Sequence, residues 1–204
     1  MQLTERQRDA LSELINIGFA RAGASLSDLT GQRVVLEVPQ VAIHRMSELN
    51  QALGRFVTGD VATVHQIFTG PVAGHALLLL DYDGAVALKY LLTDEPVLAG
   101  RLDASAREVL TEVGNILLNS CLGMFGNLLQ VQVSFSVPQL HLESLRAVLD
   151  SLLIGKEELK YAILVHTGFL VRESDIKGFL VIVLGVASLD RLIYEVERWE
   201  ERQV

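Results

Sequence analysis

The chain carries one polar motif twice, and this duplication restricts the folds that it can adopt. Each copy has an acidic residue, a glutamate four positions later, an asparagine three positions after that, and a proline. In both copies 22 residues separate the asparagine from the proline. The repeated positions are Asp9, Glu13, Asn16 and Pro39 in the first half, and Glu108, Glu112, Asn115 and Pro138 in the second. Because residues three and four apart share one face of a helix, the repeat predicts two equivalent helices with matching polar faces.

Composition predicts a single folded domain without a membrane-spanning helix. The chain has 204 residues, of which half are hydrophobic, and its net charge is -8. We therefore expect a single domain over residues 1–204, made of internal repeats at about 1–100 and 101–204. The negative charge argues against nucleic acid and anionic lipid as partners. No apolar run reaches the ~18 residues of a membrane helix. The single cysteine, Cys121, and the lack of an evident signal peptide predict a reducing, cytoplasmic location.

Hydrophobic periodicity predicts the same order of elements in each half. In the first half we expect a helix over residues 4–29, opened by a Thr4/Gln7 capping box and stopped by Gly31. Strands follow at 34–38, 56–68 and 74–82, then a helix at 86–92. The second half predicts a helix from about 103–105 to 125 with a stop at 126–127, strands at 131–137, 161–171 and 177–186, and a helix at 189–202. Whether residues 142–153 form an extra helix is left open by the sequence.

These elements predict an α+β fold. We expect two pseudo-symmetric α-β-β-β-α halves that share one mostly antiparallel six-stranded sheet. Neither half is expected to be stable alone, because each three-stranded unit would leave an edge and an apolar face exposed.

The repeated motif resembles that of the CheC/CheX/FliY family of chemotaxis phosphatases, and the duplication is most similar to CheC. The family motif is Asp or Ser, three residues, Glu, two residues, Asn, 22 residues and Pro. The first half matches it at every position, whereas Glu108 in the second half stands where the family has Asp or Ser. The resemblance covers nearly the whole chain and implies a CheC-like fold.

The resemblance also implies an activity: hydrolysis of the aspartyl phosphate on a CheY-type response regulator. Asn16 and Asn115 would orient the attacking water, while Glu13 and Glu112 would pair with the lysine of the receiver. A neutral carboxamide suits this task, since it accepts a hydrogen bond from water, donates to phosphoryl oxygens and does not repel them. The chain would need no cofactor of its own, because the receiver carries the Mg²⁺. The deamidase CheD is a further partner that the family implies.

Several roles remain open from the residues themselves. Asp9 and Glu108 are expected to contact the partner at the rim or to supply charge near a helix N-terminus. Glu108 has a second interpretation, because Ser105 and Glu108 form a capping-box pattern. Pro39 and Pro138 are expected to shape the strand end beneath each helix. An exposed Glu and Asn on a helix are also ordinary features of a solvated face.

Two other kinds of function compete with the phosphatase. The first is a non-catalytic or weakly catalytic adaptor that binds phospho-receivers or CheD, and the second is a component of a flagellar-motor or other receiver system. A metal site is not expected, because the five histidines are scattered along the chain and form no ligand motif. No glycine-rich phosphate loop is present either.

Overall fold

The structure is a computed structural model that describes residues 3–57, 59–95, 102–129, 132–153, 159–171 and 174–202. Its elements in chain order are α1 (Glu5–Thr30), β1 (Val34–Leu36), β2 (Gln40–Arg45), α2 (Met46–Leu53), β3 (Asp60–Thr69), β4 (Gly74–Asp81), α3 (Tyr82–Thr93), α4 (Ala104–Leu129), β5 (Ser134–Phe135), β6 (Gln139–Ser144), α5 (Leu145–Leu153), β7 (Leu159–Val171), β8 (Ser174–Gly185) and α6 (Val186–Glu201).

All the strands belong to one antiparallel sheet. Its order is β1-β7-β8-β4-β3-β5, with β2 also paired to β7 and β6 also paired to β3. Strands β1, β2, β3 and β4 of the first half correspond to β5, β6, β7 and β8 of the second. Exchanging each strand for its counterpart reproduces the same order in reverse, so the sheet has a pseudo-twofold axis between β4 and β8. The first strand of each half pairs with a strand of the other half: β1 pairs with β7, and β5 pairs with β3. This exchange joins the two repeats in one sheet.

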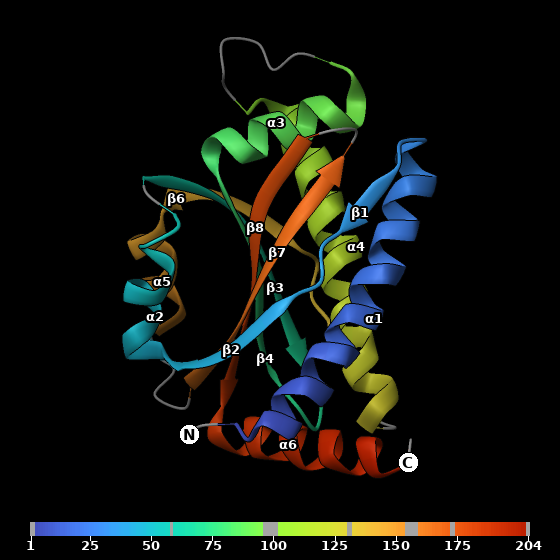
Figure 1. Cartoon of the computed structure of the whole chain (residues 1–204). Coiled ribbons are helices and arrows are strands. Elements are labelled where there is room, and N and C mark those ends of the chain that lie inside the picture. The colour runs from blue at the N-terminus through green and yellow to red at the C-terminus, as the bar shows by residue number, and fades with distance from the viewer. Residues whose placement is uncertain are drawn as a thin grey trace.

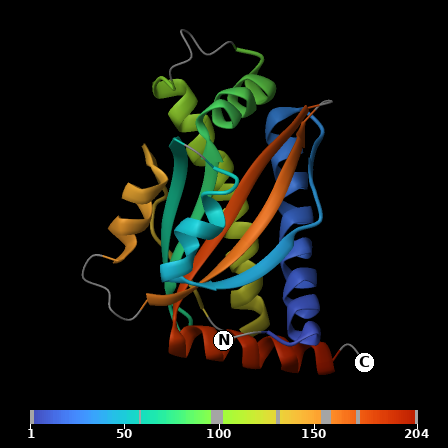
Figure 2. The ribbon, with the colours of Figure 1, turned by 60° about the vertical axis from the view of Figure 1, so that its left-hand side comes forward.

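Helices cover both faces of this sheet (Figure 1). The long helices α1 and α4 lie antiparallel on one face, with α6 across one end of the pair and α3 near the other. The short helices α2 and α5 lie over the opposite face, as the turned view in Figure 2 also shows. The core has two parts accordingly. A large cluster fills the space beneath α1 and α4, and a smaller one lies beneath α2 and α5.

Local sequence explains the positions of the main elements. Helix α1 begins at the predicted capping box, where the Gln7 backbone N–H donates to Thr4 Oγ1 at 3.2 Å and the Gln7 side chain accepts from the Thr4 N–H at 2.8 Å. It ends at Gly31, whose φ of 65° favours glycine. The apolar runs of β4 and β8 form the central strand pair, which is buried on both faces.

The α+β class and the antiparallel sheet are confirmed, but the sheet has eight strands rather than six. Each half contains an additional strand and short helix, which are β2 with α2 and β6 with α5. Residues 142–153 divide between β6 and α5, so the extra helix exists but is shorter than the segment. The predicted stop at 126–127 is wrong, because α4 continues to Leu129. Val131, the predicted start of a strand, lies outside the described residues.

Among the described residues, no helix combines the length and apolar character that crossing a membrane requires.

Candidate functional site

The first copy of the motif forms a polar stripe on α1. Asp9 and Glu13 are exposed and Asn16 is half-buried, while Leu11 and Leu14, which lie between them in the sequence, are buried in the core. Spacings of four and three residues keep the three polar side chains on one side of the helix. The glutamate is thus open to solvent, and the carboxamide lies deeper beside it.

The stripe points away from the partner helix. Gly18 packs against α4, where a Cβ at this position would lie 3.1 Å from Cys121 Cα. Asn16 is two residues earlier, which is about 200° around an α-helix, so it lies on the opposite side of α1 from α4. Asn16 shares its side instead with Gly23 and Ser27, both of which contact the backbone of β1. The stripe therefore borders the edge of the sheet formed by β1 and β2.

Pro39 lies at the corresponding height along this edge. Asn16 precedes Gly23 by about 10 Å of helix. Pro39 follows Leu36, which lies near Gly23, by about 10 Å of strand. By these ideal spacings the motif proline and asparagine lie at a similar level on neighbouring elements.

Both motif prolines mark a bulge in an edge strand. Leu36 pairs with Phe169 and Gln40 with His166, so three residues on the edge strand oppose two on β7. The same mismatch occurs in the second half, where Phe135 pairs with Phe68 and Gln139 with His65. Pro39 and Pro138 are the last residues of these insertions. A proline suits a bulge because it has no backbone N–H to donate to a ladder.

The second copy of the motif forms the equivalent stripe on α4. Glu108 and Glu112 are exposed and Asn115 is half-buried. The capping interpretation of Glu108 is wrong. The helix begins at Ala104, and the Asp103 carboxylate accepts a hydrogen bond from the Ala106 N–H at 2.9 Å. Glu108 therefore lies in the second turn, as Asp9 does on α1.

The two asparagines differ in their surroundings. Asn119 lies one turn after Asn115, and its Nδ2 donates to Asn115 Oδ1 at 2.7 Å. The Oδ1 atom of Asn119 is itself buried and has no hydrogen-bond partner within the described residues. The corresponding position on α1 is Ala20, which cannot hold Asn16 in this way. Comparison of the two motif copies did not predict this hydrogen bond, although the sequence shows an asparagine four residues after Asn115 and an alanine four residues after Asn16.

Neither glutamate is neutralised. Within the part of the chain that the structure describes, Glu13 and Glu112 have no ion-pair partner, so each can accept an incoming ammonium group. The only thiol is unsuited to nucleophilic attack. Cys121 is buried beneath the helix pair, and burial raises its pKa well above the usual range. Polar contacts to a partner are thus the chemistry that these two stripes can offer.

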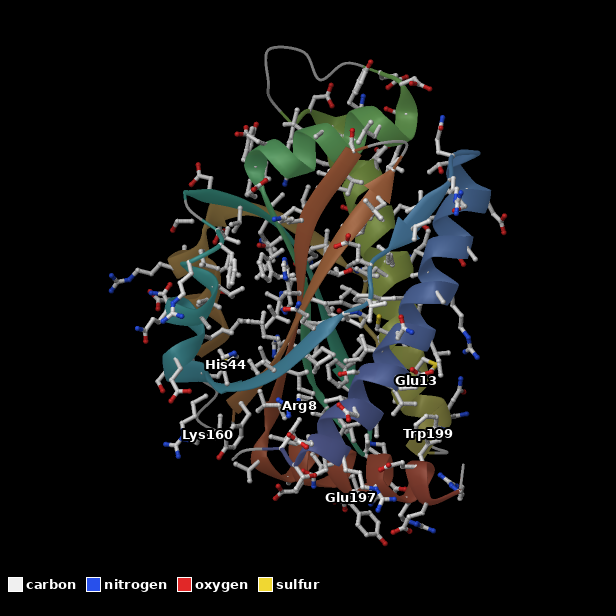
Figure 3. All side chains as sticks on the ribbon, viewed as in Figure 1. Arg8, Glu13, His44, Lys160, Glu197 and Trp199 are labelled. Carbon is white, nitrogen blue, oxygen red and sulfur yellow. The ribbon has the colours of Figure 1, made fainter. Side chains whose placement is uncertain are left out.

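The histidines are not scattered in space. All five lie on the face of the sheet opposite α1 and α4, at alternating positions of their strands. Figure 3 shows His44 and Glu13 on opposite sides of the molecule. No group of three or more potential metal ligands occurs among the described residues. The sequence alone could not reveal this convergence, because it depends on strand register.

No protein-family model matches the chain. A curated relative, the CheY-P phosphatase CheC of Bacillus subtilis, is 24% identical over 197 residues, and the match covers 93% of each chain. The structure of Thermotoga maritima FliY superposes with a TM-score of 0.75 at 18% identity, covering 97% of this chain and 99% of that one. The curated relative and the shared fold both support the resemblance of this chain to the CheC/CheX/FliY family.

The same fold also occurs in FliM. The FliM middle domain from H. pylori superposes with a TM-score of 0.69 at 10% identity, covering 95% of this chain and 99% of the domain. At this identity the likeness concerns the fold alone. The relatives that these comparisons name include a CheY-P phosphatase, and the activity of the present chain depends on its own residues.

Proposed function

We propose that this protein hydrolyses the aspartyl phosphate of a CheY-type response regulator, with one site on α1 and another on α4. The observation that carries the proposal is the duplicated pair of an exposed glutamate and a half-buried asparagine, with one copy on α1 and the other on α4. The similarity to a protein named as a CheY-P phosphatase, over nearly the full length of both chains, supports it.

The chemistry requires little from the protein itself. An acyl phosphate is already activated, so its hydrolysis needs a water molecule in line with the phosphorus and a partner that is held still. In each site the half-buried carboxamide, Asn16 or Asn115, accepts a hydrogen bond from that water. Its NH₂ group donates to a phosphoryl oxygen. Because the group is neutral, it brings no charge that would repel the phosphoryl group.

Each exposed glutamate has the task of docking. Glu13 and Glu112 lie one turn before their asparagines and form no ion pair with another described residue, so each can form a charge-assisted hydrogen bond with a lysine of the receiver. The Mg²⁺ in this scheme belongs to the receiver. The chain supplies positioning, which is worth about 7–11 kcal/mol in the best intramolecular models.

The decisive experiment measures decay of a phosphorylated CheY-type receiver from the same genome, with Mg²⁺ and substoichiometric amounts of the protein. We expect Asn16→Ala and Asn115→Ala each to slow the accelerated decay, and the double variant to abolish it. Asn50→Ala is the matched control, because Asn50 is an exposed asparagine on α2, on the other face of the sheet. A double variant that accelerates decay as well as the unmodified protein would refute the catalytic role.

The glutamates give a separate test of docking. Glu13→Gln and Glu112→Gln are expected to raise the receiver concentration needed for half-maximal rate more than they lower the maximal rate. The reason is that the carboxylate pairs with the receiver and not with the water. A fall in maximal rate alone would assign the glutamates to the chemical step instead.

A non-catalytic adaptor is the second candidate. It is favoured by Glu108, which departs from the family motif, and by the occurrence of the fold in the FliM middle domain. An adaptor would bind the phospho-receiver, or the deamidase CheD, without turnover. Catalytic amounts of the protein distinguish the two, since an enzyme clears an excess of phosphorylated receiver and an adaptor leaves the decay rate unchanged.

A further inference from the structure

A cavity of about 310 Å³ lies on the histidine-bearing face of the sheet, away from both Glu–Asn pairs. Its floor comes from three neighbouring strands, with Gln40 and His44 on β2, Leu164 and His166 on β7, and Phe179 on β8. One wall is formed by Ala52 near the end of α2 and by Arg55 and Phe56 just after it. Its volume falls within the range of small-ligand sites.

A buried polar atom without a hydrogen-bond partner among the described residues belongs to a residue that lines the cavity. The ring of His166 stacks on two aromatic rings that also contact each other, with centroid distances of 5.7 Å to Phe56, 4.8 Å to Phe179 and 5.6 Å between the two phenylalanines. Its Nε2 atom is buried and makes no hydrogen bond within the described residues. A buried polar atom without a partner costs about 1–3 kcal/mol, so a group that supplies one would bind favourably.

The titratable lining of the cavity is entirely basic. Among the described residues, His44, Arg55 and His166 line it and no aspartate or glutamate does, although the chain has 25 acidic residues and a net charge of -8. Arg55 is exposed and has no ion-pair partner in the part of the chain described. Arginine forms paired hydrogen bonds with the two oxygens of a carboxylate. The remaining lining is mostly apolar.

We propose that this cavity is a binding site for a small organic carboxylate with a flat apolar body. Arg55 and His44 bind the carboxylate at the mouth, His166 Nε2 forms a hydrogen bond inside, and the body packs against Phe56 and Leu164. The volume accommodates about ten non-hydrogen atoms, at the ~30 Å³ that a water molecule occupies. Because the cavity lies across the sheet from α1 and α4, such a ligand leaves both polar stripes free.

The test is a titration of the intact protein with benzoate as the probe, followed by imidazole ¹H–¹⁵N NMR signals. His166 is assigned by its loss in His166→Phe, a change that keeps an aromatic ring in the stack. We expect saturable shifts of the His166 and His44 signals with a dissociation constant of roughly millimolar order, as suits so small a ligand. His65, His75 and His141 lie toward the other edge of the same face and are internal controls.

Two comparisons decide the outcome. Benzamide has the same shape without the charge and is expected to bind at least about tenfold more weakly. Arg55→Gln is expected to weaken benzoate binding by a similar factor. Arg33→Gln, at an exposed arginine next to β1, is the matched control and is expected to leave the affinity unchanged. The proposal is overturned if benzoate gives no saturable shift, if benzamide binds equally well, or if Arg55→Gln binds benzoate normally. The first result would mean that the cavity does not bind the probe, and the other two would mean that Arg55 does not recognise the carboxylate.

Discussion

Gly114 sets how closely α4 approaches the sheet beside the second polar stripe. A Cβ at this position would lie 2.5 Å from both Cβ and Cγ1 of Val64 and 2.8 Å from its Cγ2. Val64 is buried on β3 and hydrogen-bonded into the middle of the sheet, so it cannot move aside without moving the strand. An added methyl group would have to push α4 outward by about 1 Å to restore ordinary contact near 3.5 Å.

We therefore expect Gly114→Ala to destabilise the protein. Overpacking a buried contact costs about 1–3 kcal/mol, and sometimes more. The better helix propensity of alanine returns up to about 1 kcal/mol. Since the clash involves three side-chain atoms, we expect a net loss of about 1–2 kcal/mol. The assay measures urea unfolding by circular dichroism and compares the free energies of unfolding of the variant and the unmodified protein at equal m-value.

Gly123→Ala is a matched control in the same helix. A Cβ at Gly123 would have no atom within 4 Å, so the change is expected to stabilise the protein by about 0.4–1 kcal/mol through propensity and unfolded-state entropy. Two identical substitutions nine residues apart should thus have opposite signs. If Gly114→Ala proves as stable as Gly123→Ala, the argument that Val64 limits this helix is wrong.

Two more predictions concern residues buried near the helix pair. In an Asn16→Ala background, Asn119→Ala is expected to slow receiver dephosphorylation about two- to tenfold, the equivalent of one hydrogen bond. It should have no effect in an Asn115→Ala background, and an equal effect in both would indicate a merely structural role. Cys121 should resist thiol reagents until the protein unfolds, because its raised pKa keeps it protonated. Above the ordinary thiol pKa of about 8.5, the unfolded chain loses this proton and the folded one does not. The free energy of unfolding should then fall by up to about 1.4 kcal/mol for each unit of increasing pH. Cys121→Ala is expected to remove this part of the pH dependence.

The sequence by itself determined the local features of this protein. The Thr4 cap, the Gly31 stop and the apolar runs of β4 and β8 depend on neighbouring residues, and they were predictable for that reason. The polar stripes were predictable too, because helical spacing places Glu13 beside Asn16 without help from the rest of the fold.

Only the tertiary structure decided how these pieces meet. Strands β2 and β6 carry weak local signals, since Gln40–Arg45 and Gln139–Ser144 mix polar and apolar residues and gain their stability from pairing with β7 and β3. The exchange of strands between halves, the convergence of the histidines and the contact of Gly114 with Val64 all join residues distant in sequence. Such contacts depend on register and packing, which short-range patterns do not encode.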